Sequence, residues 1–335
     1  MRTLGHVPAL DGLRGIAILL VLAVHADGLI PGGWFGVDLF FVLSGFLITS
    51  ILIGEWGAKG RISLSDFYRR RGLRLFPALA LMLGVYVLLG GDRLAALYGA
   101  TYSMNVVRAA GVVVPDGMEH LWSLAAEEQF YLVWPPILYL ALRRGVTPKM
   151  LATALLLVIV AAMTWRAVLA SSAPHYRLVL GPDTHADPIL IGCIAGLAFS
   201  FRFVSRVPSW LASAALVPAS VLVAFLGYRH FTSAYGLATP AFALACAVVV
   251  LACVLHRNWW FGRLVNRAPL RYLGRISYGV YLWHLPLYFA LGWEVGLPLA
   301  LAISALSYRY VEQPFLRRKR PRAHIAQAPV PVVAT

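Results

Sequence analysis

Apolar stretches close to the length of a membrane-spanning helix recur along the whole chain, separated by polar segments. A spanning α-helix needs roughly 20 predominantly apolar residues. The pattern therefore predicts an all-α fold, a polytopic transmembrane helix bundle of about ten spans. Several stretches are short or interrupted by proline and glycine, which is tolerated where protein or a cavity surrounds the helix. The expected spans are Ala9–Ala26, Gly36–Gly54, Arg74–Gly91, Glu128–Leu142, Met150–Ala170, Ala186–Phe201, Trp210–Tyr228, Tyr235–Leu255, Ser277–Trp293 and Gly296–Val311.

Basic residues are unevenly distributed among the segments between these spans. Cytoplasmic loops of membrane proteins carry an excess of Lys and Arg. If the N-terminus is cytoplasmic, the segments inside hold most of the basic residues and the segments outside hold few. We therefore expect a multi-pass protein of the plasma membrane with both termini in the cytoplasm. The basic residues of the outer segments are Arg93, Arg108, Arg177 and Arg229.

The composition also indicates a membrane protein. Of the 335 residues, 60% are hydrophobic and 13% are charged, and the mean hydropathy is +0.74, whereas a soluble domain carries about 25% charged residues. A soluble enzyme, a secreted disulfide scaffold and a disordered regulator are therefore excluded. The net charge of +15 is explained by the cytoplasmic loops, so it indicates the lipid bilayer and not nucleic acid as a partner. The three cysteines lie in apolar stretches and are expected to be buried.

The chain divides into two parts. Residues 1–315 are expected to form one integral membrane domain, and residues 316–335 a basic, disordered cytoplasmic tail. The first apolar stretch could also be taken for a cleaved signal peptide, but Asp11 and Arg14 leave its apolar region too short. We therefore expect it to remain as a span. Motifs of zinc enzymes and phosphate-binding loops are absent from the sequence.

Arg14 and His25 are ionisable residues within the first expected span. Such residues are costly in a membrane and are candidates for function. At 100° per residue the two lie about 20° apart on one face of a helix, and roughly 16 Å apart along its axis. Taken singly, Arg14 could reach back to the membrane surface and His25 could be interfacial. Their common face favours a functional pair.

Asp38 opens the second expected span, at the same membrane end as His25. A carboxylate near a histidine can fix its tautomer and stabilise the imidazolium, as general-base catalysis requires. Asp38 could equally cap the start of its helix. The sequence leaves both interpretations open.

Four arginines fall within six residues between Arg69 and Arg74. Such a cluster is typical of a cytoplasmic topology anchor. Guanidinium groups also bind phosphate through paired hydrogen bonds, so the cluster could hold a multiply charged cytoplasmic cofactor. The anchor is the simpler interpretation from composition alone.

Two adjacent carboxylates, Glu127 and Glu128, stand at the expected outer end of the fourth span, near Trp122. They could belong to a solvated helix N-terminus, which favours negative charge. They could also orient a hydroxylated substrate beside the aromatic face of Trp122. His284 lies about two turns into the ninth expected span, where a buried, hydrogen-bonded histidine is the simpler interpretation.

Six motifs in order resemble the membrane-bound acyltransferase family 3, which O-acylates carbohydrates and related acceptors. The resemblance covers the chain from about Ala9 to Phe315. The motifs are Arg14-x10-His25, Gly36-Val37-Asp38-Leu39-Phe40-Phe41 through Ser44-Gly45-Phe46, Arg71-x-x-Arg74 with Pro77, Trp122-Ser123-Leu124 through Glu127-Glu128-Gln129-Phe130-Tyr131, Ser277-Tyr278 through His284, and Glu312-Gln313-Pro314.

The resemblance implies an acyl-CoA-dependent O-acyltransferase without a metal. It implies acyl-CoA, usually acetyl-CoA, as the donor, with its phosphates at the inner arginines and its pantetheine arm beside the first span. A hydroxyl of a carbohydrate, glycolipid or similar molecule is the implied acceptor, and His25 would take its proton. The implied site residues are His25, Arg14, Asp38, Glu127 and Glu128 for catalysis, Arg70, Arg71, Arg74, Ser277 and Tyr278 for the donor, and Trp122, Asp187 and His284 for the acceptor.

The chain departs from the family pattern at one point. Where the family often has Thr-Arg-Ala-Asp, this sequence has Thr184-His185-Ala186-Asp187, so the contact made by that arginine is in question. The sequence also lacks the soluble catalytic domain that some relatives carry, so the transmembrane unit is expected to complete the transfer alone.

Two other functions fit parts of the sequence. Intramembrane charges and broken helices also suit a transporter or flippase, which would release no thiol. The acceptor could also be a small secondary metabolite such as a macrolide, and the sequence does not choose among acceptors.

Overall fold

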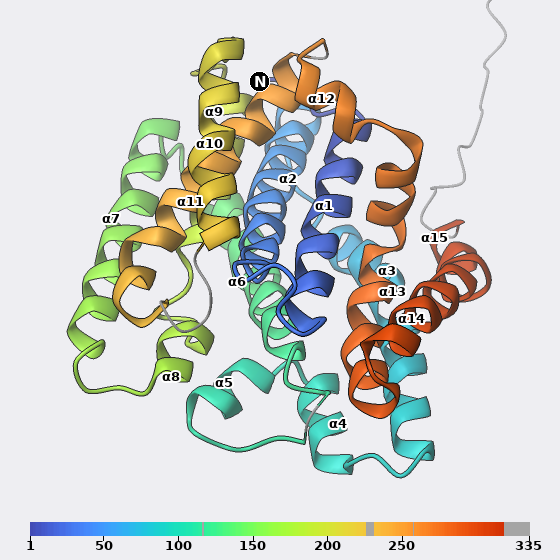
Figure 1. Cartoon of the computed structure of the whole chain (residues 1–335). Helices are drawn as coiled ribbons and strands as arrows, with labels where there is room; N and C mark the ends of the chain where they lie inside the picture. The colour runs from blue at the N-terminus through green and yellow to red at the C-terminus, as the bar shows by residue number, and fades with distance from the viewer. Residues whose placement is uncertain (116, 226–230, 257, 318–335) are drawn as a thin grey trace, which may run out of the picture.

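The computed structural model describes residues 1–317 except 116, 226–230 and 257. This part of the chain is all-α, with no strand (Figure 1). Each of the ten expected spans coincides with one long helix. These helices are α1 (Pro8–His25), α2 (Phe35–Lys59), α3 (Leu64–Leu88), α6 (Leu121–Arg143), α7 (Pro148–Leu169), α9 (Asp187–Ser200), α10 (Ser209–Phe225), α11 (Phe231–Leu255), α13 (Ala268–Leu291) and α14 (Trp293–Ser307).

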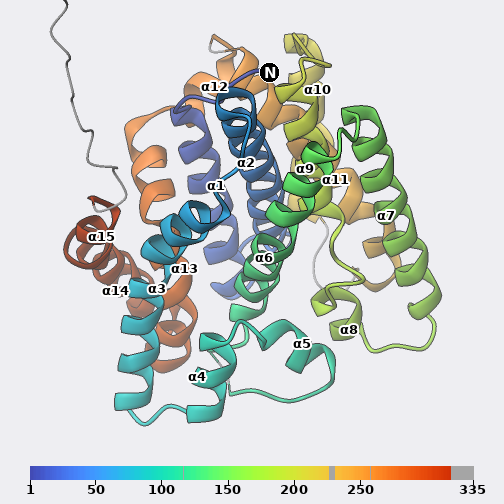
Figure 2. The ribbon, with the colours of Figure 1, turned by 180° about the vertical axis from the view of Figure 1, so that it is seen from behind.

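Short helices lie at the two ends of the bundle. At one end are α4 (Arg93–Ala100), α5 (Met104–Ala109) and α8 (His175–Leu180), and near the other end are the N-terminus and α12 (Trp260–Val265) (Figures 1 and 2). A π-helical turn, Tyr308–Glu312, leads from α14 into α15 (Gln313–Arg317). Leu316 and Arg317 therefore end a helix, while the rest of the expected tail, and the end of the seventh span at Tyr228, lie outside the described residues.

Several helices have the length and composition of a membrane span. Within the described part of the chain, five stretches are long and apolar enough to cross a bilayer. Two shorter apolar helices, α9 and α10, lie beside them. The membrane-crossing stretches are Pro8–His25, Phe35–Lys59, Leu64–Leu88, Pro148–Leu169 and Gly236–Leu255.

Glycines bring the helices that carry the candidate site into close contact. A Cβ atom on Gly15 would collide with the backbone of α13, and one on Gly274 would collide with the backbone of α1. Gly45 and Gly192 make the same close approach between α2 and α9. Small residues at such crossings let helix backbones pack tightly inside a membrane. The contacts fix α1 against α13 and α2 against α9.

Two helices begin earlier than the sequence predicted. The expected third span starts at Arg74, but α3 starts at Leu64, where the Ser63 hydroxyl accepts a hydrogen bond from the backbone N–H of Asp66 at 3.4 Å. The expected fourth span starts at Glu128, but α6 starts at Leu121. Charged residues were taken as the boundaries of the spans, so both starts were predicted too late. The arginine cluster therefore lies on α3 and the two glutamates on α6, and of these residues Arg71, Glu127 and Glu128 are largely buried.

Candidate active site

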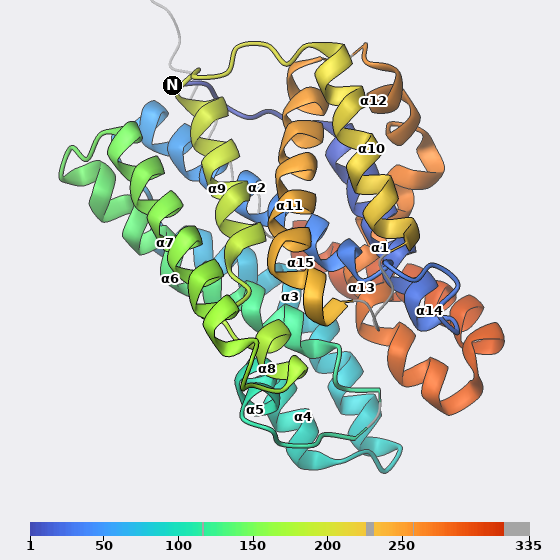
Figure 3. The ribbon, with the colours of Figure 1, turned by 60° about the vertical axis from the view of Figure 1, so that its left-hand side comes forward.

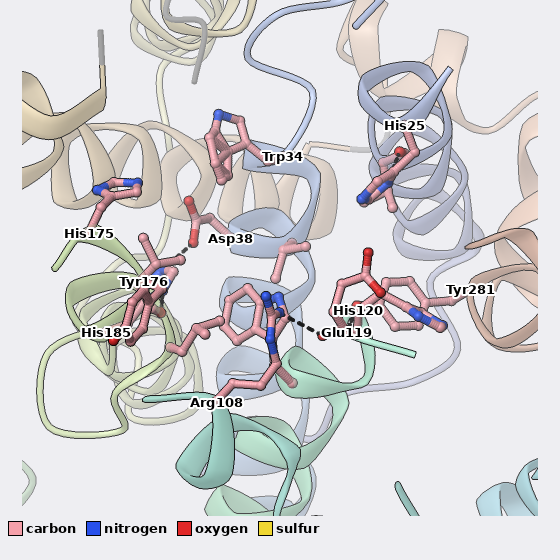
Figure 4. Close-up of a pocket in the computed structure, with 15 residues that line it drawn as sticks. His25, Trp34, Asp38, Arg108, Glu119, His120, His175, Tyr176, His185 and Tyr281 are labelled. Carbon is pink, nitrogen blue, oxygen red and sulfur yellow. Dashed lines mark hydrogen bonds and ion pairs between the residues drawn. The ribbon is translucent and has the colours of Figure 1, made fainter. Parts of the chain in front are cut away.

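A cavity of about 170 Å³ opens at the α8 end of the bundle, beside the last turn of α1 (Figure 4). One wall carries His25, His120 and Tyr281, and the facing wall carries His175 and His185. Aromatic rings, imidazoles and carboxylates alternate around it. We call this cavity the outer pocket, and its mixture of apolar faces with a few polar groups is typical of a ligand site.

His25 is the last residue of α1, and its side chain is exposed to the outer pocket. Its Nδ1 lies 2.8 Å from the carbonyl oxygen of Val21, one turn earlier. Because a carbonyl oxygen can only accept, Nδ1 carries the ring proton and Nε2 is the basic nitrogen. His25 thus has the tautomer that a general base requires.

Asp38 is bound to His185 on the wall opposite His25. Its Oδ1 lies 2.8 Å from Nε2 of His185, whose Nδ1 lies 2.7 Å from the carbonyl oxygen of Val179. A carbonyl oxygen can only accept, so Nδ1 of His185 carries a proton, and Nε2 shares a proton with the carboxyl group of Asp38. Both ring nitrogens of His185 are therefore engaged within the protein. The structure therefore pairs Asp38 with the residue that replaces the family's arginine. It does not pair Asp38 with His25, as one sequence interpretation expected.

Trp122 lines the outer pocket and packs on His185. The two rings are 5.7 Å apart between centroids and inclined by 30°. The indole belongs to the first turns of α6, so the early start of that helix brings it into the pocket. An aromatic face beside carboxylates and imidazoles suits a sugar.

Asp187 is held away from the outer pocket by a buried ion pair. Arg166 of α7 donates from Nη1 to Asp187 Oδ1 at 2.8 Å and from Nη2 to Oδ2 at 3.1 Å. The guanidinium also donates to the carbonyl oxygens of Thr184 at 2.7 Å and Gly236 at 3.0 Å. The pair joins α7 to α9 and α11. Both oxygens of Asp187 are thus engaged within the protein, and Asp187 does not line the outer pocket.

His284 lies directly behind His25, fully buried. Their ring centroids are 5.2 Å apart, and His120 is 5.1 Å from His284 on another side. Nδ1 of His284 donates to the carbonyl oxygen of Tyr281 at 2.7 Å. The Tyr281 hydroxyl donates to the carbonyl oxygen of His120 at 2.5 Å and accepts from Ser123 at 2.5 Å. His284 therefore supports the ring of His25 and does not line the outer pocket.

A second, smaller cavity lies deeper in the bundle. Its volume is about 40 Å³, and Arg14, Glu127, Ser277 and Tyr278 are among its walls. Val37 and Tyr281 line both this inner cavity and the outer pocket. Arg14 donates from Nη2 to the Ser277 hydroxyl at 3.3 Å. The face of α1 predicted from the Arg14–His25 spacing thus follows a line of cavities from mid-bundle to the outer pocket.

The two glutamates of α6 are bound to Arg71 of α3. Arg71 Nη2 lies 3.5 Å from Glu127 Oε1 and 3.3 Å from Glu128 Oε1. Its guanidinium also stacks on the ring of Tyr131, 3.3 Å from the centroid. The hydroxyls of Ser44 and Tyr131 both donate to Glu127 Oε1. These carboxylates therefore lie about two turns into α6 and not at its start, and they are bound by an arginine from the predicted anchor.

The remaining donor-site candidates lie on α3 and α13. Arg70 faces Glu55 of α2 at 3.9 Å, close to the end of the bundle that carries α12. Arg74 is half-buried, one turn beyond Arg70 on α3. Tyr278 donates to the carbonyl oxygen of Leu75 at 3.0 Å, which joins α13 to α3. Of the two donor-site arginines that form ion pairs, Arg71 is the more buried, with 18% of its side chain exposed against 38% for Arg70.

Several residues of the site were given no role by the sequence interpretation. Ser44, His120 and Tyr281 hydrogen-bond or pack within it, and Glu119 lines the outer pocket. Arg166 was likewise given no role. A buried arginine in a span pairs with an opposite charge or with backbone carbonyls. Its carboxylate partner, Asp187, is 21 residues away, so spacing within one helix does not reveal the pair. Among the described residues, no group of three or more His, Cys, Asp or Glu side chains is arranged to hold a metal ion.

Comparisons with known proteins agree with these motifs. The chain is 32% identical over 348 residues to the peptidoglycan O-acetyltransferase OatA of Listeria monocytogenes, covering 92% of this chain and 56% of that protein. It is 27% identical over 356 residues to the O-acetyltransferase OatA of Staphylococcus aureus, covering 94% of this chain and 58% of that protein. The chain therefore spans little more than half the length of these relatives. No solved structure matches it.

The family comparison covers almost the whole described bundle. Residues 7–305 match the acyltransferase domain of family 3. This segment includes both residues of the first-span pair, the Asp38–His185 pair, the Arg71–glutamate cluster and His284. The chain therefore belongs to the acyltransferase family 3.

Proposed function

We propose that this protein transfers an acetyl group from cytoplasmic acetyl-CoA to a hydroxyl of a carbohydrate-type acceptor in the outer pocket. The observation that carries the proposal is the line of cavities along α1 between Arg14 and His25. Near one end Arg71, which binds Glu127 in the wall of the inner cavity, offers a guanidinium group for phosphate, and at the other end His25 offers a basic Nε2. The relatives named as O-acetyltransferases support an acetyl donor.

The geometry supports a direct transfer with His25 as the general base. Nε2 of His25 takes the proton of the acceptor hydroxyl while its oxygen attacks the thioester carbonyl carbon. A C–O bond forms, the C–S bond breaks, and the imidazolium returns the proton to the departing thiolate of CoA. Arg14 donates to Ser277 in the inner cavity. There it supplies positive charge beside the proposed path of the pantetheine arm of the donor.

The outer pocket supports a hydroxylated acceptor. Trp122 offers an aromatic face, and Asp38, held in place by His185, offers a carboxyl group beside it. Acetylation of peptidoglycan, as the name of the Listeria relative states for that protein, is one instance of this class. Mass spectrometry of wall glycans, lipids and metabolites from cells with and without the chain tests the proposal. An added acetyl group on one hydroxylated species is expected, and its absence together with absence of CoA release from the purified protein would contradict it.

Arg74→Gln is expected to raise the KM for acetyl-CoA by about tenfold or more and to leave the acceptor KM nearly unchanged, since one charge-assisted hydrogen bond to phosphate is lost. Arg74 is preferable to Arg71, whose removal would leave Glu127 and Glu128 uncompensated inside the bundle. Arg74→Lys should recover part of the affinity, because lysine keeps the charge but lacks the paired hydrogen bonds. Steady-state kinetics of CoA release give the measurement.

The control for Arg74 is Arg69→Gln. The side chain of Arg69 is 54% exposed and pairs with Asp66 at 3.5 Å, so its loss should change neither KM. Equal effects of the two substitutions, or altered membrane insertion at unchanged KM, would show that the cluster serves only as a topology anchor.

The proposed route requires ten spans with both termini in the cytoplasm. In sealed inside-out vesicles, added acetyl-CoA should be consumed, whereas in right-side-out vesicles external acetyl-CoA should be inert. Cysteine labelling checks the topology independently of activity. Ile30→Cys should react with an impermeant reagent from outside, and Ala58→Cys should not. The native cysteines, Cys193, Cys246 and Cys253, are buried and should not interfere. The opposite labelling pattern would overturn the topology and the route.

A further inference from the structure

A large apolar groove lies beside the outer pocket, lined by residues of α6, α7 and α9. Figure 3 shows the course of these three helices. Its volume is about 480 Å³. Ala126, Val133 and Ile137 line it from α6, and Ala154 and Val158 line it from α7. The side chains of Val133, Ile137 and Val158 are about half exposed. The groove is thus an open apolar channel on the flank of the bundle.

The few polar groups in the wall of the groove are already engaged within the protein. Gln129 donates to the carbonyl oxygen of Tyr102 at 2.8 Å, and Trp134 donates to the hydroxyl of Thr49 at 2.9 Å. Both ring nitrogens of His185 are engaged, as described above. The wall therefore offers an occupant apolar contacts only, and a hydrocarbon chain satisfies such a site without an unpaired polar group.

The groove adjoins the proposed site at two points. His185 lines both the groove and the outer pocket, and Phe41 lines both the groove and the inner cavity of Arg14. A molecule with its hydrocarbon part in the groove would therefore have its polar end beside the imidazole of His185. Trp122 stacks on that same imidazole from within the pocket.

The length of the groove fits one lipid tail. Ala126 and Ile137 are eleven residues apart on α6, which is about 16 Å at 1.5 Å per residue. The hydrocarbon core of a bilayer is about 30 Å thick, so the groove covers about one leaflet. It starts at the level of the outer pocket and runs inward from there.

We propose that the acceptor is lipid-linked: a single long hydrocarbon chain lies in the groove between α6 and α7 while its hydroxylated head occupies the outer pocket. This inference rests on the proposed function, because it makes the outer pocket the acceptor site. It narrows the acceptor to an amphiphile of the outer leaflet. The groove orients the head and holds its hydroxyl near His25.

Photo-crosslinking in phosphatidylcholine liposomes tests the groove without requiring turnover. The probe is a hexadecyl glucoside with a diazirine in mid-chain, and the reference is a phosphatidylcholine carrying the same chain. The glucoside should label peptides of α6 and α7 in preference to the other lipid-facing helices, and unlabelled hexadecyl glucoside should compete. The phosphatidylcholine should label all lipid-facing helices without this preference.

Two substitutions fill the groove, and one matched substitution does not. Ala154→Trp and Val158→Phe should each lower labelling of α6 and α7 by the glucoside at least tenfold. Val160→Phe is the control, since Val160 is 51% exposed against 52% for Val158 but does not line the groove. Two residues further along α7, it points away from Val158 by about 200° around the helix axis. Equal labelling by the two probes, or labelling unchanged in both groove variants, would show that bulk membrane lipid fills the groove and would overturn the proposal.

Release of CoA from acetyl-CoA, measured in the same liposomes, separates this inference from the proposed function. Absence of CoA release in the wild-type protein would contradict the function, whatever the labelling shows. CoA release that is the same in wild type and Ala154→Trp with every acceptor, together with non-selective labelling, would leave the function standing and remove the lipid-linked acceptor.

Discussion

His25→Ala is expected to lower the rate of acyl transfer by roughly 10²-fold or more while the bundle stays folded. The substitution removes the basic Nε2, and the hydrogen bond that it also removes is a local one to Val21 within the same helix. The KM for acetyl-CoA should change little, because the proposed phosphate contacts lie at the other end of α1. Single-turnover CoA release, with the folded state checked by size-exclusion chromatography, gives the measurement.

His6→Ala serves as the control for His25. His6 precedes α1, its side chain is 76% exposed, and it lies 3.2 Å from the carboxylate of Asp11. Its loss should leave transfer at the wild-type rate. Turnover of His25→Ala within a few-fold of wild type would remove His25 from the role of base.

The largest effect on stability is expected from Arg166→Met. The side chains of Arg166 and Asp187 are 2% and 0% exposed, so the substitution leaves a carboxylate buried without its cation. Breaking a buried pair in this way costs about 3–5 kcal/mol. Thermal unfolding in detergent should show the loss, and Asp187→Asn should lower the stability in the same direction.

Two comparisons isolate the cause of the Arg166 effect. The double variant Arg166→Met with Asp187→Leu should recover much of the stability, because two apolar side chains replace the buried pair. Arg177→Ala breaks a neighbouring pair whose side chains are 27% and 42% exposed, and should cost about 0–1 kcal/mol. If Arg166→Met and Arg177→Ala lowered the unfolding temperature equally, Arg166 would not hold the bundle together.

The helices were predictable from the sequence because membrane spans are read from local composition. Each of the ten apolar stretches became one long helix, and the common face of Arg14 and His25 follows from the helical repeat alone. The starts of α3 and α6 were predicted too late, because a charge was taken as the end of a span. In the structure Arg71 and Glu127 compensate each other inside the bundle, so neither needs water.

The pairing of the polar residues could not be predicted, because the partners are far apart in sequence. Asp38 and His185 are separated by 147 residues, and Ser44 and Glu127 by 83. Asp38 lines the same pocket as His25, but the packing of α2 on α9 places His185, from the segment before α9, in contact with Asp38. The close approach at Gly45 and Gly192 holds α2 against α9 and so brings Asp38 to His185. No spacing rule within one helix reveals this pairing.

His185 stands where the family pattern often has arginine, and it makes the charge of the outer pocket depend on pH. Arginine keeps its charge at every physiological pH, whereas histidine can lose its proton. Burial disfavours the imidazolium, but the charge and hydrogen bond of Asp38, with the charge of Asp187, outweigh it and raise the pKa of His185. Its positive charge is therefore complete in acidic surroundings and disappears as the pH rises through the raised pKa. We therefore expect the proposed binding of the acceptor in the outer pocket to weaken as the pH rises through the raised pKa of His185.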